Sequence, residues 1–473
     1  MNNIIIKCCI VLTAMNGLFG CAARQREFDI PARIEPLSVD LESGRFNISQ
    51  HSLSNGLQVL IAEKPSAPVV SVQVWYRVGN ADETDGIRGM AHLLEHMMFR
   101  GSKNYPDQQH ARLINSVGGT CNAYTSDEMT VYWQRLPSNK LEQALKLEAD
   151  RMKSLNLAAG TFETERAVVL EEYRMRVEND PTGRMEQSVR KLLFAGHPYE
   201  TGPIGTYKDV SDITLEQCRD FYDKYCCPNN AVLVIVGDVE TAEALRLTQK
   251  HFGSAPRGKT PPRNIPQVNP LHVPQESRST TELPVPVTVL AVYTDGLQSR
   301  ESLAAEIIFK SLAGGKSGRM WKRLVAEKKI AEYFAGVNIQ GGNNGIMFFG
   351  AVSLPFLEDK CRRAMLDEIE LVKKDGLSEF EFIKARNQMY AEMIFSRLNA
   401  NETAGRIGES ELLRGGYEKF YELITRVESL TQEDIKHAAE KYFTPENIKT
   451  VYFEPEKGMF IAEVAGFFKS IFY

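Results

Sequence analysis

The chain has 473 residues, of which 43% are hydrophobic and 25% are charged, and its 56 basic and 61 acidic residues give a formal net charge of −5. This composition is typical of globular proteins and excludes a disordered, collagen-like or coiled-coil chain. The slight acidic excess is unlike the basic surface that a nucleic-acid partner requires, so no such partner is expected. At about 100–200 residues per domain, the length predicts two to four domains.

Residues 1–20 have the order of a secretory signal, with a lysine before a short apolar run and small residues after it. The run Cys8–Met15 is too short to cross a bilayer, which takes about 20 residues. The segment Leu18-Phe19-Gly20-Cys21 resembles the site at which a bacterial lipoprotein signal is cut and its cysteine lipidated. Because Ala22 and not aspartate follows, that resemblance favours the outer membrane. We expect a periplasmic, lipid-anchored protein; the alternative is an ordinary signal cleaved near a cysteine.

The segment Gly89–Phe99, GMAHLLEHMMF, predicts a buried helix that carries polar groups on one face. His92 and His96 stand one turn apart, so both imidazoles can reach one metal ion. Together with Glu95 they form His-x-x-Glu-His, the reverse of the better-known zinc-peptidase helix motif. Glu95 is placed to take a proton from a zinc-bound water and not to ligate the metal. The alternative is a chance match in a core helix.

A second helix is predicted at Thr161–Pro181, and it carries many carboxylates. A helical wheel places an apolar arc on Phe162, Val168, Val169, Tyr173 and Met175. Glu165 and Glu172 fall near the middle of that arc, seven residues apart on one face, whereas Glu163 and Glu171 fall outside it. Carboxylates that point into a core need a partner, so the wheel selects Glu172 over Glu171 as a candidate third ligand. The alternative is a buried ion pair with an arginine on the same arc, Arg176.

Two segments of 23 residues, which start at Thr214 and Thr431, match without a gap at an offset of 217 residues. Each predicts a helix, a Pro-Asn turn and a strand. The strands predicted at 69–76 and 285–293 are a second echo of the same unit. The body of the chain is therefore two copies of one α+β unit, with sheets covered on one side by helices.

A proline-rich stretch separates the two copies and predicts a semi-rigid linker at 255–278. We accordingly expect an N-terminal segment at 21–50, a zinc-binding catalytic domain at 51–254 and a homologous inactive domain at 279–473. The helix predicted after Tyr293 contains no histidine, so the second copy lacks the metal motif. The apolar tail 458–473 predicts a helix that docks on its own domain or faces a partner or membrane.

The His92–His96 motif followed 76 residues later by Glu172 resembles the pitrilysin/insulinase family of zinc peptidases, in the branch of the processing-type enzymes. The resemblance runs from about His51 to Phe453 and is supported by Gly118–Thr125, His197–Tyr199, Asn229–Ala231 and Val236–Asp238. It implies two homologous α/β-sandwich domains of the mitochondrial-processing-peptidase and pitrilysin type. It also implies one zinc held by His92, His96 and Glu172, Glu95 as general base, Glu165 as an acid behind the ligands, and substrate pairing at Asn122 and Ala123.

Members of this family often carry an arginine and a tyrosine, seven residues apart, in the second domain to grip the substrate. In the corresponding segment of this chain, Val325 stands in place of the arginine and Glu332 in place of the tyrosine, with Tyr333 one position away. The absence of this clamp implies a partner, a homologous zinc-free subunit that carries it, in a heterodimer; a homodimer is the alternative. The expected function is a zinc metalloendopeptidase acting on peptides or unfolded segments, and the alternative is a non-catalytic assembly subunit of a similar complex.

Overall fold

The computed structural model describes residues 46–456. The signal at 1–20, the expected lipid anchor at Cys21 and the apolar tail at 458–473 lie outside these residues. Within 46–456, no helix has both the length and the apolar character needed to cross a bilayer.

The first half of the chain forms a six-stranded sheet in the order β1-β2-β6-β3-β5-β4. Adjacent strands are antiparallel except β2 and β6, which are parallel. The strands are β1 (Ile48–Ser52), β2 (Gln58–Glu63), β3 (Val69–Tyr76), β4 (Thr120–Thr125), β5 (Thr130–Pro137) and β6 (Ala231–Gly237). The helices are α3 (Met90–Met97), α4 (Gln109–Ser116), α5 (Leu141–Ser154), α6 (Ala159–Tyr173), α7 (Pro181–Leu193), α8 (Tyr207–Asp212), α9 (Leu215–Tyr225) and α10 (Thr241–Phe252).

The second half repeats this arrangement with a five-stranded sheet in the order β7-β11-β8-β10-β9, in which only β7 and β11 are parallel. Strands β7, β11, β8, β10 and β9 correspond in this order to β2, β6, β3, β5 and β4 of the first sheet. The predicted α+β duplication is therefore confirmed. The strands are β7 (Glu276–Thr281), β8 (Val287–Asp295), β9 (Ala331–Gln340), β10 (Asn344–Ser353) and β11 (Ile448–Pro455). The helices are α11 (Arg300–Ala313), α12 (Arg319–Trp321), α13 (Glu358–Asp375), α14 (Glu379–Phe395), α15 (Ala400–Leu413), α16 (Lys419–Glu428) and α17 (Gln432–Tyr442).

The two matched segments fold alike in detail. Thr214 caps α9 and Thr431 caps α17, each within a capping box that satisfies the free amides of the first helical turn. After each helix, Asn230 and Asn447 donate their side-chain amides to the carbonyl five residues earlier, at 2.9 and 2.6 Å. The residues that repeat at the 217-residue offset are therefore those that start the helix and fix the turn into the strand.

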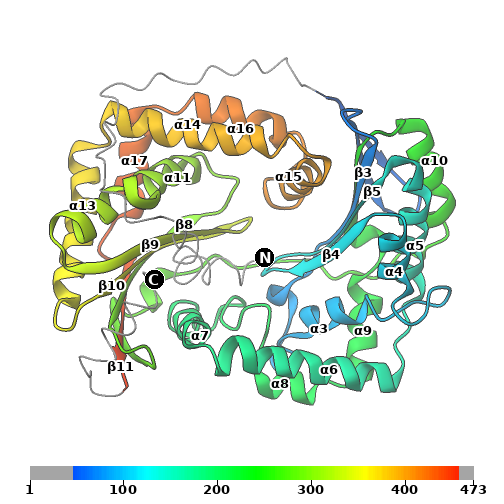
Figure 1. Cartoon of the computed structure of the whole chain (residues 1–473), viewed down its shortest axis with the longest axis horizontal. Helices are drawn as coiled ribbons and strands as arrows, with labels where there is room; N and C mark the ends of the chain where they lie inside the picture. The colour runs from blue at the N-terminus through cyan, green and yellow to red at the C-terminus, as the bar shows by residue number, and fades with distance from the viewer. Residues whose placement is uncertain (1–45, 457–473) are drawn as a thin grey trace, which may run out of the picture.

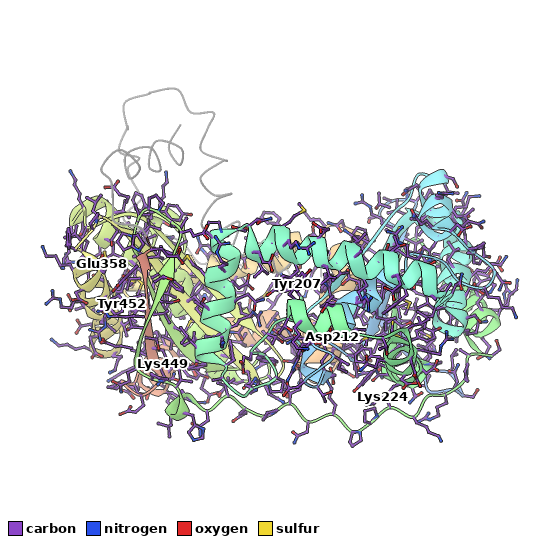
Figure 2. All side chains as sticks on the ribbon, turned by 90° about the horizontal axis from the view of Figure 1, so that it is seen from below. Tyr207, Asp212, Lys224, Glu358, Lys449 and Tyr452 are labelled. Atoms are coloured by element: carbon purple, nitrogen blue, oxygen red, sulfur yellow. The ribbon has the colours of Figure 1, made fainter. Side chains whose placement is uncertain are left out.

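Each sheet has one face covered by helices of its own half, and Figure 1 shows the two sheets on either side of the middle of the molecule. In the first half, buried residues of α3, α5, α9 and α10 pack against alternate residues of β3 and β6. In the second half, α11, α13, α14 and α17 pack against β8 and β10 in the same way. Figure 2 shows the underside, with α8 marked by Tyr207 and Asp212, and β11 of the second sheet marked by Lys449 and Tyr452.

The opposite face of each sheet is covered by helices of the other half. α15, from the second half, lies beside the first sheet in Figure 1. Its residues Ala404 and Ile407 belong to the same buried cluster as residues of that sheet. Its Gly408 lies so close to Trp75 that a Cβ there would be 2.2 Å from the indole ring. α7, from the first half, packs Met185 and Leu193 against the second sheet. The two copies in the sequence are thus joined into one packed body.

The proline-rich connection between the halves is anchored along its course. Residues 253–275 contain one short 3-10 helix, Pro270–His272, and otherwise no regular element. The guanidinium of Arg263 forms two 2.9 Å hydrogen bonds with the carboxylate of Asp82. β7 begins at Glu276, inside the segment predicted as linker. The connection is therefore tied to the first half at Arg263 and, through Pro266 and Val268, to Asn344 of the second half.

Candidate metal centre

Helix α3 places two imidazoles side by side in the protein interior. Its residues Leu93, Leu94 and Met97 are buried in the core of the first half and fix the orientation of the helix. His92 and His96 consequently project from the same face, with ring centroids 4.9 Å apart at an interplanar angle of 83°. This is the geometry that the i, i+4 spacing predicts.

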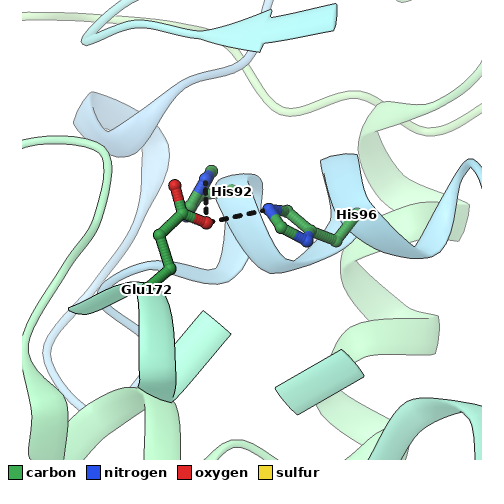
Figure 3. A group of neighbouring side chains, drawn as sticks. All are labelled: His92, His96 and Glu172. Carbon is green, nitrogen blue, oxygen red and sulfur yellow. Dashed lines mark ion pairs between the residues drawn. The ribbon is translucent and has the colours of Figure 1, made fainter. Parts of the chain in front are cut away.

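Glu172, at the end of α6, completes a group of three possible metal ligands (Figure 3). Its Oε2 lies 3.7 Å from Nε2 of His92 and 3.2 Å from Nε2 of His96. One donor atom from each of the three residues lies within 4.8 Å of the other two. Two imidazole nitrogens and one carboxylate oxygen form a donor set that suits zinc and leaves a fourth position for a reactant, so the residues present fit this metal.

The protonation of the metal-free cluster follows from burial and from the contacts between its members. Burial and the neighbouring His96 lower the pKa of His92 to about 4. For His96, burial lowers the pKa, but hydrogen bonds to Glu165 and Glu172 outweigh it and raise the pKa to about 9. Burial raises the pKa of Glu172, whereas the hydrogen bond from His96 and the nearby charges bring it down to about 2. Without metal the cluster is therefore a charged His96–Glu172 pair, and metal binding must displace a proton.

Glu95 lies beside the cluster but is not one of its three ligands. Its Oε2 accepts a 2.6 Å hydrogen bond from the hydroxyl of Thr125 on β4. Burial raises the pKa of Glu95, an effect that the Thr125 hydrogen bond opposes. A buried carboxylate with a raised pKa that is held beside a metal position has the properties of a general base.

The cluster opens into a pocket of about 550 Å³ whose lining residues all belong to the first half of the chain. Asn122 and Ala123, the predicted substrate-binding residues, lie on β4 and line this pocket. β4 is the last strand of its sheet and pairs only with β5 among the described residues. An extended peptide in the pocket could therefore add a strand along β4.

Behind the cluster, Glu165 joins His96 to Arg100. Oε2 of Glu165 lies 3.6 Å from Nδ1 of His96, and Oε1 forms an ion pair with the guanidinium of Arg100. A carboxylate on the second ring nitrogen orients an imidazole and raises its basicity as a metal ligand. By contrast, Nδ1 of His92 is buried and has no hydrogen-bond partner among the described residues.

The helical wheel of α6 is correct for the carboxylates and wrong for two apolar residues. Glu165 is buried, whereas Glu171 is 63% exposed and pairs with Arg174. Val168 and Met175, expected in the buried arc, are 41% and 68% exposed. Val168 lies within α6 but outside its buried stripe, which is narrower than the predicted arc. Met175 lies beyond the end of α6 at Tyr173, where the regular helical step no longer applies.

The alternative of an ion pair between Glu172 and Arg176 is also present in the structure. Nη2 of Arg176 lies 2.6 Å from Oε1 of Glu172. The other oxygen of the same carboxylate faces the two histidines. The ion pair and the contact with the histidines therefore coexist because each uses a different oxygen.

Three residues that support the site escaped the sequence patterns. The buried carboxylate of Glu83 accepts hydrogen bonds from the amides of Gly89 and Ala91, at 2.8 and 2.7 Å, and so caps the start of α3. Thr125 and Arg100 hold Glu95 and Glu165. Glu83 lies seven residues before the first residue of the helix, in an irregular loop, where helix-capping patterns carry no signal. Thr125 and Arg100 act across elements whose pairing only the fold determines.

The segment expected to lack the substrate clamp lies in the second half. Val325 falls in the π-helix Lys322–Glu327 and packs against the core of that half. Tyr333, on β9, lines a mainly apolar cavity of about 80 Å³ together with Met185 of α7. Neither residue lines the pocket of the metal cluster.

Comparisons with known proteins agree with this architecture. A family profile described as insulinase, peptidase family M16, matches residues 58–206, and a profile described as the M16 inactive domain matches residues 212–389. The zinc protease PqqE of Helicobacter pylori is 28% identical over 411 residues, which cover 85% of this chain and 92% of that protein. The mitochondrial-processing peptidase subunit beta of Lentinula edodes is 26% identical over 406 residues, which cover 83% of this chain and 86% of that protein.

A solved structure leads to the same conclusion. The crystal structure of a protease from Helicobacter pylori superimposes with a TM-score of 0.79 at 27% identity, covering 87% of this chain and 100% of that one. The two family profiles together cover more than half of the chain and match it in both halves. The chain therefore belongs to the insulinase family, peptidase family M16, and carries the inactive domain of that family after its first domain.

Proposed function

We propose that this protein is a zinc-dependent endopeptidase that cleaves peptides or unfolded segments. The observation that carries the proposal is the convergence of His92, His96 and Glu172, with Glu95 beside them and accepting a hydrogen bond from Thr125. The related zinc protease of Helicobacter pylori supports it. A non-catalytic assembly subunit would not need a carboxylate in the position of Glu95.

The residues present have distinct roles in such a reaction. His92, His96 and Glu172 would hold the zinc, which when bound would supply Lewis acidity to a peptide carbonyl and to a water molecule. Glu95 would act as the base that takes a proton from the attacking water and would return it to the leaving amine. β4, through the backbone around Asn122 and Ala123, aligns the peptide as an added strand.

Removal of the metal tests the proposal directly. We expect the purified chain to contain one zinc and to lose peptide cleavage when a chelator removes it, and we expect cleavage to return when zinc is restored. Metal analysis and cleavage of a quenched fluorescent peptide measure both. A chain that retains one zinc but cleaves no peptide, alone or with proteins co-purified from its native envelope, would instead be the non-catalytic subunit.

We also propose that a second, homologous chain without zinc completes the site. The motivation is that Val325 and Glu332 occupy the positions of the family's arginine and tyrosine clamp, and that none of the described residues of the second half lines the metal pocket. Donors that act on developing charge are worth about 3–4 kcal/mol of transition-state stabilisation, or roughly 10²–10³ in rate. The isolated chain should consequently be weakly active.

Mixing the chain with such a partner should raise peptide cleavage by about 10²–10³-fold, and changing the partner's clamp arginine to alanine should remove the gain. Cleavage rates of the chain alone, the mixture and the altered mixture give the comparison. Full activity of the isolated chain, unaffected by any partner, would show that the chain needs no second subunit.

We further propose that the mature protein begins at a lipidated Cys21 and is anchored at the outer membrane, facing the periplasm. The basis is the signal-like order of residues 1–20 and the segment that ends at Cys21. The wild-type protein should fractionate with membranes, and Cys21→Ser should not be processed at this site. Mass spectrometry of the mature N-terminus measures this, and equal solubility with cleavage elsewhere in both proteins would contradict the proposal.

A further inference from the structure

The two oxygens of Glu172 have different neighbours. Oε2 faces both imidazoles, at 3.7 and 3.2 Å, and Oε1 lies 2.6 Å from Nη2 of Arg176. The Glu172 side chain is only 17% exposed. A largely buried carboxylate with one oxygen held by a guanidinium has one oxygen left for other contacts, and here that oxygen points at the histidines (Figure 3).

Arg176 lies in a local departure from regular helix. After α6, residues Arg174–Glu178 form a π-helical turn, in which the amide of Asn179 donates to the carbonyl of Arg174 at 2.7 Å. Single π-helical turns cost stability relative to a continuous α-helix and are common at functional sites. The turn leads directly into α7, which lines the same pocket as the metal cluster.

Gly183 of α7 fixes the position of this turn. A Cβ at residue 183 would lie 1.7 Å from the carbonyl oxygen of Arg176, a distance that no side chain tolerates. The backbone of α7 can therefore pack directly on the π-helical turn. The backbone of Arg176 is thus packed against α7. Its side chain is 41% exposed, and its guanidinium is held by the ion pair with Glu172.

We propose that Arg176 is a positioning residue for the metal centre: it holds Oε1 of Glu172 so that Oε2 alone is presented to the metal. This inference rests on the proposed zinc site. Partners of metal-ligating side chains typically change metal affinity by about 10–100-fold when they are removed. Without Arg176, the carboxylate would be free to rotate and to present either oxygen.

The neighbouring pair of Arg174 and Glu171 provides a matched control. Arg174 pairs with Glu171 and contacts the hydroxyl and ring of Tyr207, which Figure 2 marks on the underside. It comes from the same π-helical turn and carries the same charge, but it contacts none of the three ligands. A loss caused only by disturbing the turn or by removing a positive charge would therefore occur equally in Arg174→Ala.

The test is the zinc affinity of the full chain, measured by competition with a chromophoric chelator, for wild type, Arg176→Ala, Arg176→Lys and Arg174→Ala. We expect Arg176→Ala to bind zinc about 10–100-fold more weakly, Arg176→Lys to recover part of the loss, and Arg174→Ala to match wild type. The visible spectrum of bound cobalt should change in Arg176→Ala and not in Arg174→Ala, because only the first alters how Glu172 ligates.

Thermal unfolding in excess chelator serves as the folding control, and the three variants should unfold like one another. Equal zinc affinity in wild type and Arg176→Ala would overturn the proposal, as would equal losses in Arg176→Ala and Arg174→Ala. A folded wild-type chain that binds no zinc would overturn the proposed function and this inference together. A chain that binds zinc as expected but cleaves no peptide, either alone or with proteins co-purified from its native envelope, would overturn the proposed function alone.

Discussion

Glu95→Gln is expected to lower peptide hydrolysis by about 10²–10⁴-fold while leaving the zinc in place. Glutamine keeps the shape of the side chain and an oxygen that can accept the Thr125 hydrogen bond, now 2.6 Å long, so the local fold is preserved. It cannot accept a proton, and the step that needs a base is lost. Cleavage rate and zinc content, measured on the same preparation, provide the comparison.

The two measurements separate the possible roles of this carboxylate. If Glu95→Gln lost zinc together with activity, Glu95 would be a ligand and the assignment of Glu172 would need revision. If it kept most of its activity, another group would serve as base. Zinc retained with hydrolysis almost abolished is the one result that agrees with a base beside a complete ligand set.

Glu172→Gln is expected to lose zinc and, with it, detectable hydrolysis, whereas Glu171→Gln should bind zinc and cleave peptide like wild type. Oε2 of Glu172 is the atom on which both imidazoles converge, and a neutral amide is a poor zinc ligand. Glu171 is 63% exposed, and its surface ion pair with Arg174 is worth about 0–1 kcal/mol.

Comparing Glu172→Gln with Glu171→Gln tests whether Glu172 is the third zinc ligand, within one pair of adjacent residues. Both variants remove one negative charge from the same turn of α6, and the two sites differ in the direction that the side chain faces and in its burial, 17% exposed for Glu172 and 63% for Glu171. Metal analysis after dialysis, followed by thermal unfolding with and without zinc, distinguishes a lost ligand from a lost fold. Equal zinc loss in the two variants would show that the position of Glu172 on the helix does not decide ligation.

The sequence predicted the shared face of His92 and His96 on α3 and the duplication of the chain, because both depend on patterns within short segments. His92 and His96 lie on one face of α3 because helical geometry alone places i and i+4 residues together. The matched segments at Thr214 and Thr431 fold alike because capping threonines and turn asparagines act within a few residues of themselves. The burial of Glu165 followed from the same regularity.

Prediction from the sequence was wrong where it continued a regular helix past its end, and it missed contacts made by residues of irregular loops. A uniform helical step places Met175 in the buried arc, but α6 gives way to a π-helical turn at Arg174 and Met175 is exposed. Glu83 reaches the amides of α3 from an irregular loop, and such a contact has no periodic signature.

Residue spacing along single helices and strands was enough to predict the shared face of His92 and His96, the inward position of Glu172 and the repeat of one α+β unit. Two features required the packed chain: the oxygen of Glu172 that faces the histidines, and the covering of each sheet by a helix of the other half, α7 or α15. The physical reason is that an amphipathic helix specifies that it must bury an apolar face, whereas the surface against which it buries that face is settled by the packing of the whole chain.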